Sequence, residues 1–224
     1  MAKVIIFGTG KGAIIALKYL KYDTQHEVVA FTMHELYITE PVFGGLPVVS
    51  YETLQEKYPT TEFNLFAPLG YDNMNKFRAQ IFNEGKAKGY KFITYVHSSN
   101  KTIEPLQIGE NCFVLENQSI NLDVKIGNNV VIWSGNQIGD RSIIEDHVWI
   151  SSNVCISGDV QVKSYSVLAV HCTISNQVII KEENFIGANA LISKSTQPKE
   201  VYIVPSTPKA PMSSDRFIKM IKRV

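Results

Sequence analysis

Residues 131–158 read VIWSGNQIGDRSIIEDHVWISSNVCISG, and an isoleucine stands at every sixth position within them. The pattern extends in both directions without an insertion. An aliphatic residue occupies fifteen consecutive sixth positions: Ile108, Val114, Ile120, Ile126, Ile132, Ile138, Ile144, Ile150, Ile156, Val162, Leu168, Ile174, Ile180, Ile186 and Ile192. A period of six does not match the 3.6 residues of a helical turn. It suits short strands joined by tight corners, so the second half of the chain is predicted to be a repeating β-structure.

The repeat predicts a triangular prism in which each group of six residues supplies one face. Eighteen residues then complete one coil, and the whole repeat makes about five coils. The aliphatic residues stack inward, so each coil buries the face of its neighbour. The fourth residue after each aliphatic is usually small or β-branched, as at Val130, Ser142, Val148, Val154 and Cys172. Polar residues between the strands, such as Gly139 and Ser157, are suited to turns.

The first half of the chain follows a different pattern. Apolar runs at residues 3–7 and 27–32 flank a segment of helical spacing at 13–22. A second helix is predicted within NMNKFRAQIFNEGKAKG, residues 73–89, with Asn73 or Asn75 as its cap and Gly89 as its stop. Further strands are predicted within GLPVV (45–49), NLFAPLG (64–70) and YKFITYVH (90–97). This alternation indicates a small, Rossmann-like parallel α/β unit over residues 1–97.

A glycine-rich turn follows the first strand. Gly8, Gly10 and Gly12 precede the first helix, where backbone N–H groups can approach a phosphate. With Ala13 these glycines satisfy a relaxed G-x-G-x-x-A dinucleotide pattern, and Glu35 lies near the end of the second strand. A dinucleotide and a diphosphate sugar nucleotide use the same geometry, and a tight turn without any ligand fits as well.

Composition limits the classes of protein to consider. The chain has 224 residues, is 45% hydrophobic and has a net charge of +1, without the basic run that a nucleic-acid partner would favour. No apolar run approaches the roughly 18 residues of a membrane span. The N-terminal MAKVIIFGTGKG is interpreted as a first strand and not as a signal peptide. Cys112, Cys155 and Cys172 form no C-x-x-C pair, so we expect thiols in a cytoplasmic protein without a metal.

The two halves together resemble one family. VIIFGTGKGA near the N-terminus, FGGLPVV and LGYDNMNKFR in the middle, and residues 131–158 are similar to the bacterial sialic acid O-acetyltransferases and nucleotide-amino-sugar N-acetyltransferases. The resemblance covers nearly the whole chain. It implies a left-handed parallel β-helix, a homotrimer, acetyl-CoA in the groove between two prisms, and an α/β unit that holds the nucleotide of the sugar. The residues implied are Asn176, Gly187 and Ala188 for coenzyme A, and Gly8, Gly10, Gly12, Glu35 and Gly70 for the nucleotide.

The sequence departs from that family where the general base is expected. Members usually read GNHIGHHS where this chain reads GNQIGDRS, so Asp140 stands in place of a histidine. In a coil of eighteen residues, Asp140 stacks with Gly158 and Asn176. The resemblance implies that the backbone N–H of Gly158 faces the thioester oxygen, where a donor stabilises a tetrahedral oxyanion. His171 lies in another column and is the reserve candidate for the base.

The residue at position 140 bears on which acceptor is acylated. A sugar hydroxyl needs a base with a pKa near neutral, which a histidine supplies more readily than an aspartate. A neutral sugar amine attacks unaided and loses its proton after the bond has formed. We therefore expect acetyl-CoA-dependent N-acylation of a nucleotide-linked amino sugar for a surface glycan, with Asp140 as the base or as an ammonium-binding residue.

Four other functions are alternatives to this one. A sugar O-acetyltransferase has the same fold, and the missing histidine favours a catalytically silent trimer that only binds a sugar nucleotide. The glycine turn alone would also suit an NAD-linked protein. A γ-class carbonic anhydrase needs three metal-binding histidines, whereas the coils hold only His147 and His171.

The predicted prism occupies residues 98–196 together with its connecting segment, and residues 197–224 form the C-terminal part. Pro205 and Pro208 prevent regular strand pairing there. The segment SSDRFIKMIKRV, residues 213–224, predicts a short amphipathic helix capped by Ser213 or Ser214. Its apolar face is expected to pack on the trimer or to cap the open edge of the last coil.

Overall fold

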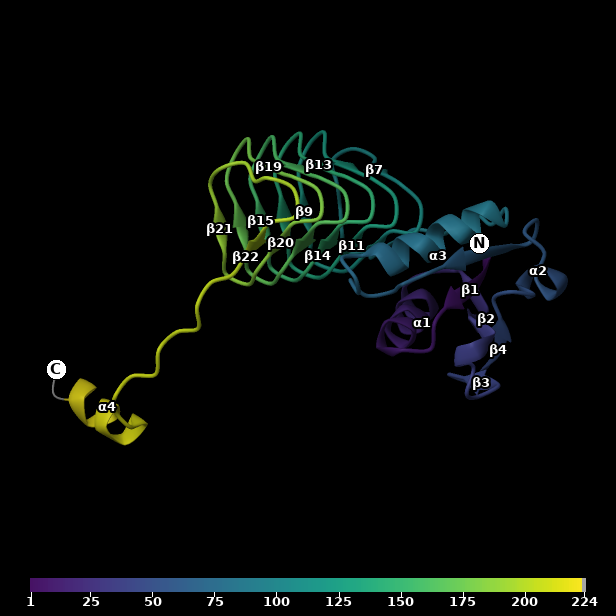
Figure 1. The fold of residues 1–224 in the computed structure, drawn as a ribbon, viewed down its shortest axis with the longest axis horizontal. Coiled ribbons are helices and arrows are strands. Elements are labelled where there is room, and N and C mark those ends of the chain that lie inside the picture. Colours follow the sequence, from purple (N-terminus) through teal and green to yellow (C-terminus); the bar gives the residue numbers. More distant parts are fainter. Residues whose placement is uncertain (223–224) are drawn as a thin grey trace.

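The computed structural model describes residues 1–222 and divides into three parts (Figure 1). An α/β unit lies at one end, a triangular prism of stacked strands lies beside it, and a C-terminal arm leaves the far end of the prism. Across residues 1–222, none of the helices combines the length and the hydropathy that a membrane crossing requires.

The α/β unit is a parallel sheet with one short antiparallel edge strand, in the order β3-β4-β2-β1-β5. Its strands are β1 (Lys3–Phe7), β2 (Glu27–Met33), β3 (Val42–Phe43), β4 (Leu46–Ser50) and β5 (Phe63–Phe66). Its helices are α1 (Lys11–Asp23), η1 (Glu35–Tyr37), α2 (Leu54–Lys57) and α3 (Lys76–Ala87). The predicted alternation of strands and helices is confirmed up to α3, and Gly89, at φ +90°, follows the end of α3 as expected. The strand predicted within residues 90–97 does not join this sheet, because Tyr95 and Val96 pair with the prism instead.

The prism has three faces built from two-residue strands. Face 1 holds β7 (Gln107–Ile108), β10 (Lys125–Ile126), β13 (Ile143–Ile144), β16 (Gln161–Val162) and β19 (Ile179–Ile180). Face 2 holds β6 (Tyr95–Val96), β8 (Phe113–Val114), β11 (Val131–Ile132), β14 (Trp149–Ile150), β17 (Val167–Leu168), β20 (Phe185–Ile186) and β22 (Val201–Tyr202). Face 3 holds β9 (Ser119–Ile120), β12 (Gln137–Ile138), β15 (Cys155–Ile156), β18 (Thr173–Ile174) and β21 (Leu191–Ile192).

The eighteen-residue coil predicted from the repeat is confirmed by the strand pairing. Ile126 pairs with Ile144, and Ile138 pairs with Ile156, in parallel register. The aliphatic residues of all three faces point inward and form one continuous buried core along the prism. Since every inward position is buried by the coils beside it, the prism is a rigid support for residues at its corners.

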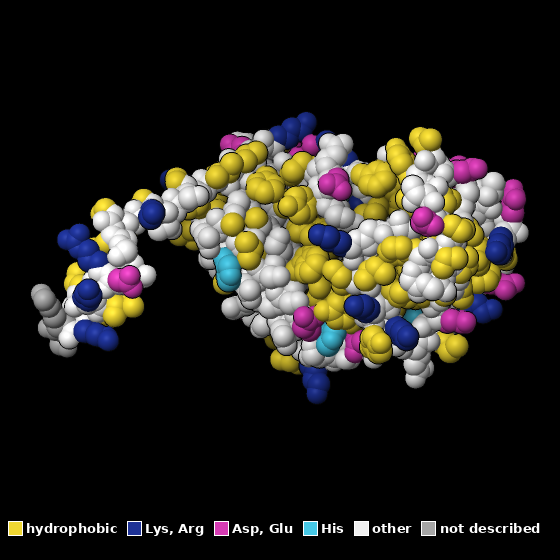
Figure 2. All heavy atoms as spheres, turned by 90° about the horizontal axis from the view of Figure 1, so that it is seen from below, with side chains coloured by type: hydrophobic (Ala, Val, Ile, Leu, Met, Phe, Trp, Pro, Cys, Tyr) yellow, Lys and Arg dark blue, Asp and Glu magenta, His cyan; other side chains and the backbone are white. Residues whose placement is uncertain are grey.

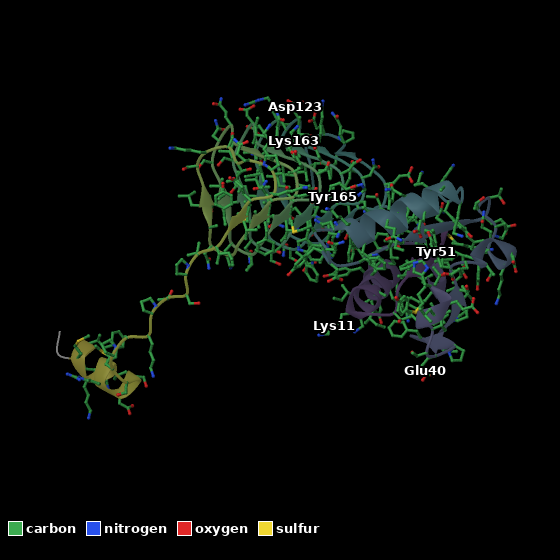
Figure 3. All side chains as sticks on the ribbon, in the orientation of Figure 1. Lys11, Glu40, Tyr51, Asp123, Lys163 and Tyr165 are labelled. Atoms are coloured by element: carbon green, nitrogen blue, oxygen red, sulfur yellow. The ribbon has the colours of Figure 1, made fainter. Side chains whose placement is uncertain are left out.

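We call the contact between the α/β unit and face 2 the joint. The outward side chains Phe113, Val131 and Trp149 are buried there against the α/β unit. Asn73 or Asn75 was expected to cap α3. Asn75 does stand directly before the helix, but its side chain makes no capping hydrogen bond. Its Nδ2 instead donates to the carbonyl of Tyr165, 3.0 Å away, on the side of the prism that faces α3 (Figure 3).

The C-terminal arm begins after β22 has paired with β20 and so extended face 2. It ends in α4 (Ser214–Ile221), where the Ser213 hydroxyl accepts a hydrogen bond from the N–H of Arg216 as predicted. Phe217, Ile218, Met220 and Ile221 are exposed on this helix, which stands away from the body (Figures 1 and 2). The expectation that the helix caps the last coil is therefore wrong for the single chain, because the extended segment carries it off the prism. Residues 223 and 224 of the predicted helix lie outside the described residues.

Candidate active site

The glycine turn lines a cavity at the joint. Gly10 is the N-cap residue of α1, and a Cβ added at Gly12 would collide with the carbonyl of Pro68. The cavity has a volume of about 440 Å³ and is closed by the indoles of Trp133 and Trp149 from the prism. Four of the predicted nucleotide residues therefore line one space, namely Gly8, Gly10, Gly12 and Gly70.

Glu35 does not join this group. It begins the short helix η1, and its backbone N–H donates to the carboxylate of Glu52 at 3.0 Å. The same carboxylate pairs with His34, and the hydrogen bonds around Glu52 fix this segment away from the cavity lining.

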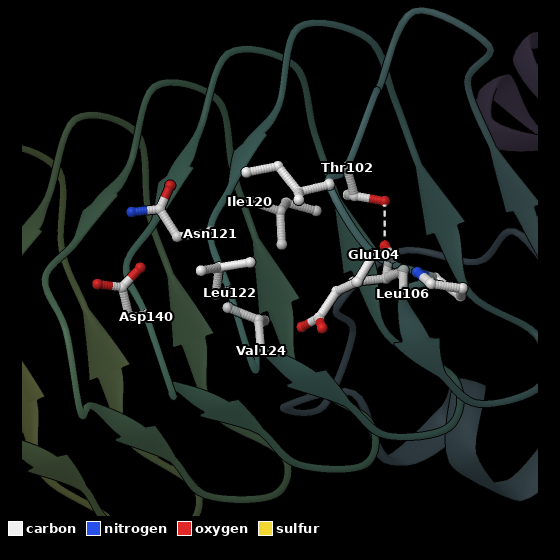
Figure 4. A pocket seen from close by; sticks show the side chains of 10 residues that line it. Thr102, Glu104, Leu106, Ile120, Asn121, Leu122, Val124 and Asp140 are labelled. Atoms are coloured by element: carbon white, nitrogen blue, oxygen red, sulfur yellow. Dashed lines mark hydrogen bonds between the residues drawn. The ribbon is translucent and has the colours of Figure 1, made fainter.

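Asp140, Gly158 and Asn176 stack as predicted at the corner between faces 3 and 1, which we call the 3–1 corner. A Cβ built on Gly158 would lie 3.5 Å from the Asp140 carbonyl and 3.2 Å from the Asn176 Oδ1. Within residues 1–222, the Gly158 amide and the Asp140 carboxylate have no hydrogen-bond partner. Asp140 is partly exposed and borders a cavity of about 220 Å³ beside Glu104 and Leu122 (Figure 4).

The other predicted residues lie at the corner between faces 2 and 3, the 2–3 corner. His171 is exposed there, with φ 60°. Gly187 is buried, and its N–H donates to the carbonyl of Tyr202 at 2.7 Å, while Ala188 is exposed. One chain therefore does not bring Asp140 together with His171, nor Asn176 together with Gly187.

His147 occupies the third corner, between faces 1 and 2, and is a structural residue. Its ring nitrogen Nδ1 lies 2.9 Å from Nδ2 of Asn129, and its ring packs 4.8 Å from that of Tyr165. Burial lowers the pKa of His147, opposed by the charge of Asp146 and reinforced by that of Arg78. His147 is 7% exposed and packs near Phe82 of α3, so its ring is enclosed by the α/β unit.

Arg78, Trp133 and Trp149 shape the glycine-lined cavity, and the sequence interpretation did not select them. The guanidinium of Arg78 is completely buried and donates to the carbonyl of Gly70 at 2.8 Å. A signal for Trp149 was present, because the position before each inward residue is apolar or aromatic on face 2 and mostly polar on the other faces. That difference marks face 2 as the covered one.

No group of three or more histidine, cysteine or carboxylate side chains that could hold a metal ion is found among residues 1–222. Cys112 and Cys172 are buried, and burial raises the pKa of each thiol to about 12.

Solved structures with a similar fold include two acetyltransferases. One is a histidine-to-asparagine variant of perosamine N-acetyltransferase from Caulobacter crescentus in complex with CoA and GDP-perosamine, with a TM-score of 0.79 and 20% identity over 90% of this chain and 93% of that one. Another is the acetyltransferase domain of PglB from Neisseria gonorrhoeae, with a TM-score of 0.75 and 17% identity over 90% of this chain and 96% of that one. A third is WeeI from Acinetobacter baumannii AYE, with a TM-score of 0.58 and 15% identity over 88% of this chain and 94% of that one.

No protein-family model and no curated protein sequence matches this chain. The structural similarity extends over both the α/β unit and the prism, since about nine-tenths of the chain is covered. The fold is that of the hexapeptide-repeat acetyltransferases, which confirms, at the level of the fold, the resemblance inferred from the sequence.

Proposed function

We propose that this chain is an acetyl-CoA-dependent N-acyltransferase that acts on a nucleotide-linked amino sugar. The observation that carries the proposal is that one chain of this fold holds both a glycine-lined cavity and an unpaired Gly158 amide stacked on Asp140. The perosamine N-acetyltransferase structure of the same fold contains CoA and GDP-perosamine, which supports the same pair of substrates here.

The proposed assembly is a cytoplasmic homotrimer of left-handed prisms, each of about five coils. Residues 1–97, a Rossmann-like unit, would bind the nucleotide, and residues 98–196 would carry the acyl transfer. The separation of the candidate residues over two corners supports a shared groove, with the 3–1 corner of one chain facing the 2–3 corner of the next. Asn176 would then contact coenzyme A from one side, and Gly187 and Ala188 from the other.

The chemistry follows from the groups at the 3–1 corner. The neutral amine attacks the thioester carbonyl, the carbon–sulfur bond breaks, and coenzyme A leaves as its thiol. The Gly158 N–H stabilises the oxyanion that forms on the carbonyl oxygen. Before the attack, Asp140 binds the ammonium form of the sugar. After the attack, Asp140 takes the proton that the nitrogen loses, directly or through water, and this proton then passes to the departing sulfur. Holding both substrates in position supplies much of the rate for an amine, which needs less help from a base than a hydroxyl does.

A second candidate is a silent sugar-nucleotide-binding scaffold. Asp140 in place of the family's histidine favours it. Solved variants of perosamine N-acetyltransferase in which a histidine is replaced by asparagine or alanine still contain both ligands, so that protein binds them without this side chain.

The test is release of the coenzyme A thiol with a panel of UDP-, TDP- and GDP-linked amino sugars. We expect turnover on one of them, a loss of about 10²-fold in kcat for Asp140→Asn with unchanged KM, and no change for His171→Ala. Loss of activity in His171→Ala alone would move the base to the 2–3 corner. Turnover on the matching hydroxyl sugars would instead identify an O-acetyltransferase. Tight binding of both substrates without turnover would overturn the enzyme proposal in favour of the scaffold.

A further inference from the structure

A second cavity adjoins the one lined by the glycine turn. It has a volume of about 570 Å³ and shares Ile15 and Trp133 with its neighbour. Its wall is formed by α1 on one side and by the start of the 2–3 corner on the other. Both cavities fall within the 300–1,000 Å³ that is typical of small-molecule sites. Because they share a wall, one extended ligand can occupy both.

Glu116 is an oriented carboxylate on the wall of this second cavity. Its Oε2 accepts a hydrogen bond from the Tyr19 hydroxyl at 2.8 Å, and its Oε1 accepts one from the Ser134 hydroxyl at 2.9 Å. A carboxylate offers about four acceptor sites, so each oxygen keeps room for another donor. Within the described part of the chain, no lysine or arginine forms an ion pair with Glu116.

Glu116 is ionised at neutral pH. Burial acts to raise the pKa of its carboxyl, but hydrogen bonds from its own backbone amide, Tyr19 and Ser134 outweigh burial and hold that pKa below its ordinary value. The cavity wall therefore carries a fixed negative charge that the cavity's other side chains do not neutralise by direct contact.

Three other charged or titratable side chains line this cavity besides its tyrosines, namely Lys18, Asp23 and His97. Lys18, on α1, forms no ion pair with Glu116 or with any other carboxylate in the described part of the chain. Asp23 accepts hydrogen bonds from the Tyr95 hydroxyl at 2.7 Å and from the N–H and hydroxyl of Ser98, so its carboxylate serves the fold. His97 accepts the Ser99 N–H at its Nδ1, 3.1 Å away. The Nδ1 of His97 is therefore engaged within the chain, since it also lies 2.9 Å from the Ser99 hydroxyl.

The indole of Trp133 belongs to the walls of both cavities. Its Nε1–H is buried and has no acceptor within residues 1–222, so this N–H lies behind the cavity wall. The ring therefore contributes apolar surface where the two cavities adjoin.

From these groups we infer that the second cavity is the amino-sugar subsite and that Glu116 selects a cationic amine over a hydroxyl. The inference rests on the proposed function, because it places the diphosphate at the glycine turn and the sugar beyond Trp133. An ammonium carries a full positive charge and several N–H donors to the remaining acceptor sites of Glu116, whereas a hydroxyl carries no charge and has a single donor. Glu116 acts here in binding and specificity, and Asp140 keeps its place in proton transfer.

The test compares two nucleotide sugars that differ only in an amine or a hydroxyl at one ring carbon, using the full-length protein and calorimetry. Wild type is expected to bind the amine roughly tenfold to a hundredfold more tightly. Glu116→Gln keeps the shape of the side chain and should reduce this preference to within about threefold, with unchanged affinity for the nucleoside diphosphate. Glu145→Gln is the matched control, because Glu145 lies on face 1, paired with Lys163 at 2.7 Å, and should keep the full preference.

The outcomes separate this inference from the proposed function. A preference for the amine that persists in Glu116→Gln would overturn the inference while leaving the transferase intact. Lost affinity for the nucleoside diphosphate in the same variant would show that Glu116 acts through the fold and would equally overturn it. Failure of the wild type to bind any nucleotide sugar, although it binds coenzyme A, would refute the proposed function itself. In wild type, the preference should also weaken as the pH rises through the pKa of the sugar amine, which a purely structural Glu116 would not cause.

Discussion

The prism and the joint are stabilised in opposite ways. Inside the prism, each coil repeats the same inward aliphatic layer, and neighbouring layers bury one another. At the joint, the α/β unit contacts the prism through individual residues that do not recur from coil to coil. Arg78 donates to prism carbonyls, Asn75 donates to Tyr165, and Trp149 packs under Tyr71 with ring centroids 5.2 Å apart.

The difference explains where binding sites can arise. A repeat leaves corners of equivalent backbone along its whole length, so one corner differs from the next only through its side chains or through a segment that covers it. The two larger candidate cavities both lie where the α/β unit covers one face and breaks that equivalence. The difference between the prism and the joint can be tested with pairs of residues of the same type. In each pair, one residue is constrained by neighbouring atoms and the other is not.

Arg78 should give the largest effect. It is completely buried, and its guanidinium donates to the carbonyls of Gly70, His147 and Asn129 at 2.8, 3.1 and 3.3 Å. Burial lowers the pKa of Arg78 to about 9, so it remains charged at neutral pH. Arg78→Met would leave these buried carbonyls without donors, and we expect a loss of about 3–5 kcal/mol in the free energy of unfolding, measured by urea denaturation.

The matched control is Arg141→Met. Arg141 pairs with Asp159 at 2.7 Å, but its side chain is 59% exposed. Exposed ion pairs contribute about 0–1 kcal/mol, so the urea midpoint should scarcely move. Equal losses in the two variants would contradict the view that the joint, and not charge pairing in general, holds the two parts together.

Much of the prism could be predicted from the sequence because its signal repeats. The fifteen aliphatic positions from Ile108 to Ile192 were identified from the sixfold spacing, and the eighteen-residue pairing followed from it. Val96 and Tyr202, which extend face 2 at its two ends, were not identified. The first strand was placed at its observed bounds, Lys3–Phe7, because a continuous apolar run ended at a glycine. These predictions depend on local residue order alone.

The joint could not be predicted in the same way, because it depends on contacts between distant segments. Arg78 reads as an ordinary polar residue of a surface helix, yet it is buried against carbonyls about seventy positions away. Of the predicted nucleotide residues, Gly8, Gly10 and Gly12 were found because they directly follow the first strand, whereas Glu35 was assigned by spacing alone and lies elsewhere. The second cavity with Glu116 had no sequence signal, since Tyr19, Glu116 and Ser134 come from three separate segments.

The glycine turn gives the second prediction, of intermediate size. A Cβ at Gly12 would collide with the Pro68 carbonyl, which is backbone and cannot turn aside, so Gly12→Ala should destabilise the fold by about 1–3 kcal/mol. A Cβ at Gly10 would meet no atom within 4 Å, so Gly10→Ala should change stability by only about 0.5 kcal/mol. Thermal unfolding of the two variants checks both values. If Gly10→Ala were the more destabilising, close approach of the backbone would not be the reason for these glycines.

The smallest effect concerns two histidines in equivalent backbone positions, His147 at the joint and His171 at the open 2–3 corner, with φ 65° and 60°. Burial lowers the pKa of His147 below its unfolded value, so the unfolded chain takes up a proton first as the pH falls. The stability from neutral His147 is therefore complete above about pH 6.5 and is lost as the pH falls towards its folded pKa, by at most about 1.4 kcal/mol per pH unit.

Asn129, one coil before His147, adopts the same left-handed conformation, so His147→Asn should be tolerated. Urea midpoints at pH 7.5 and 5.5 should differ less in His147→Asn than in wild type, whereas His171→Asn should keep the wild-type difference. The reverse result would mean that the covered corner is open to protons and that the joint does not enclose it.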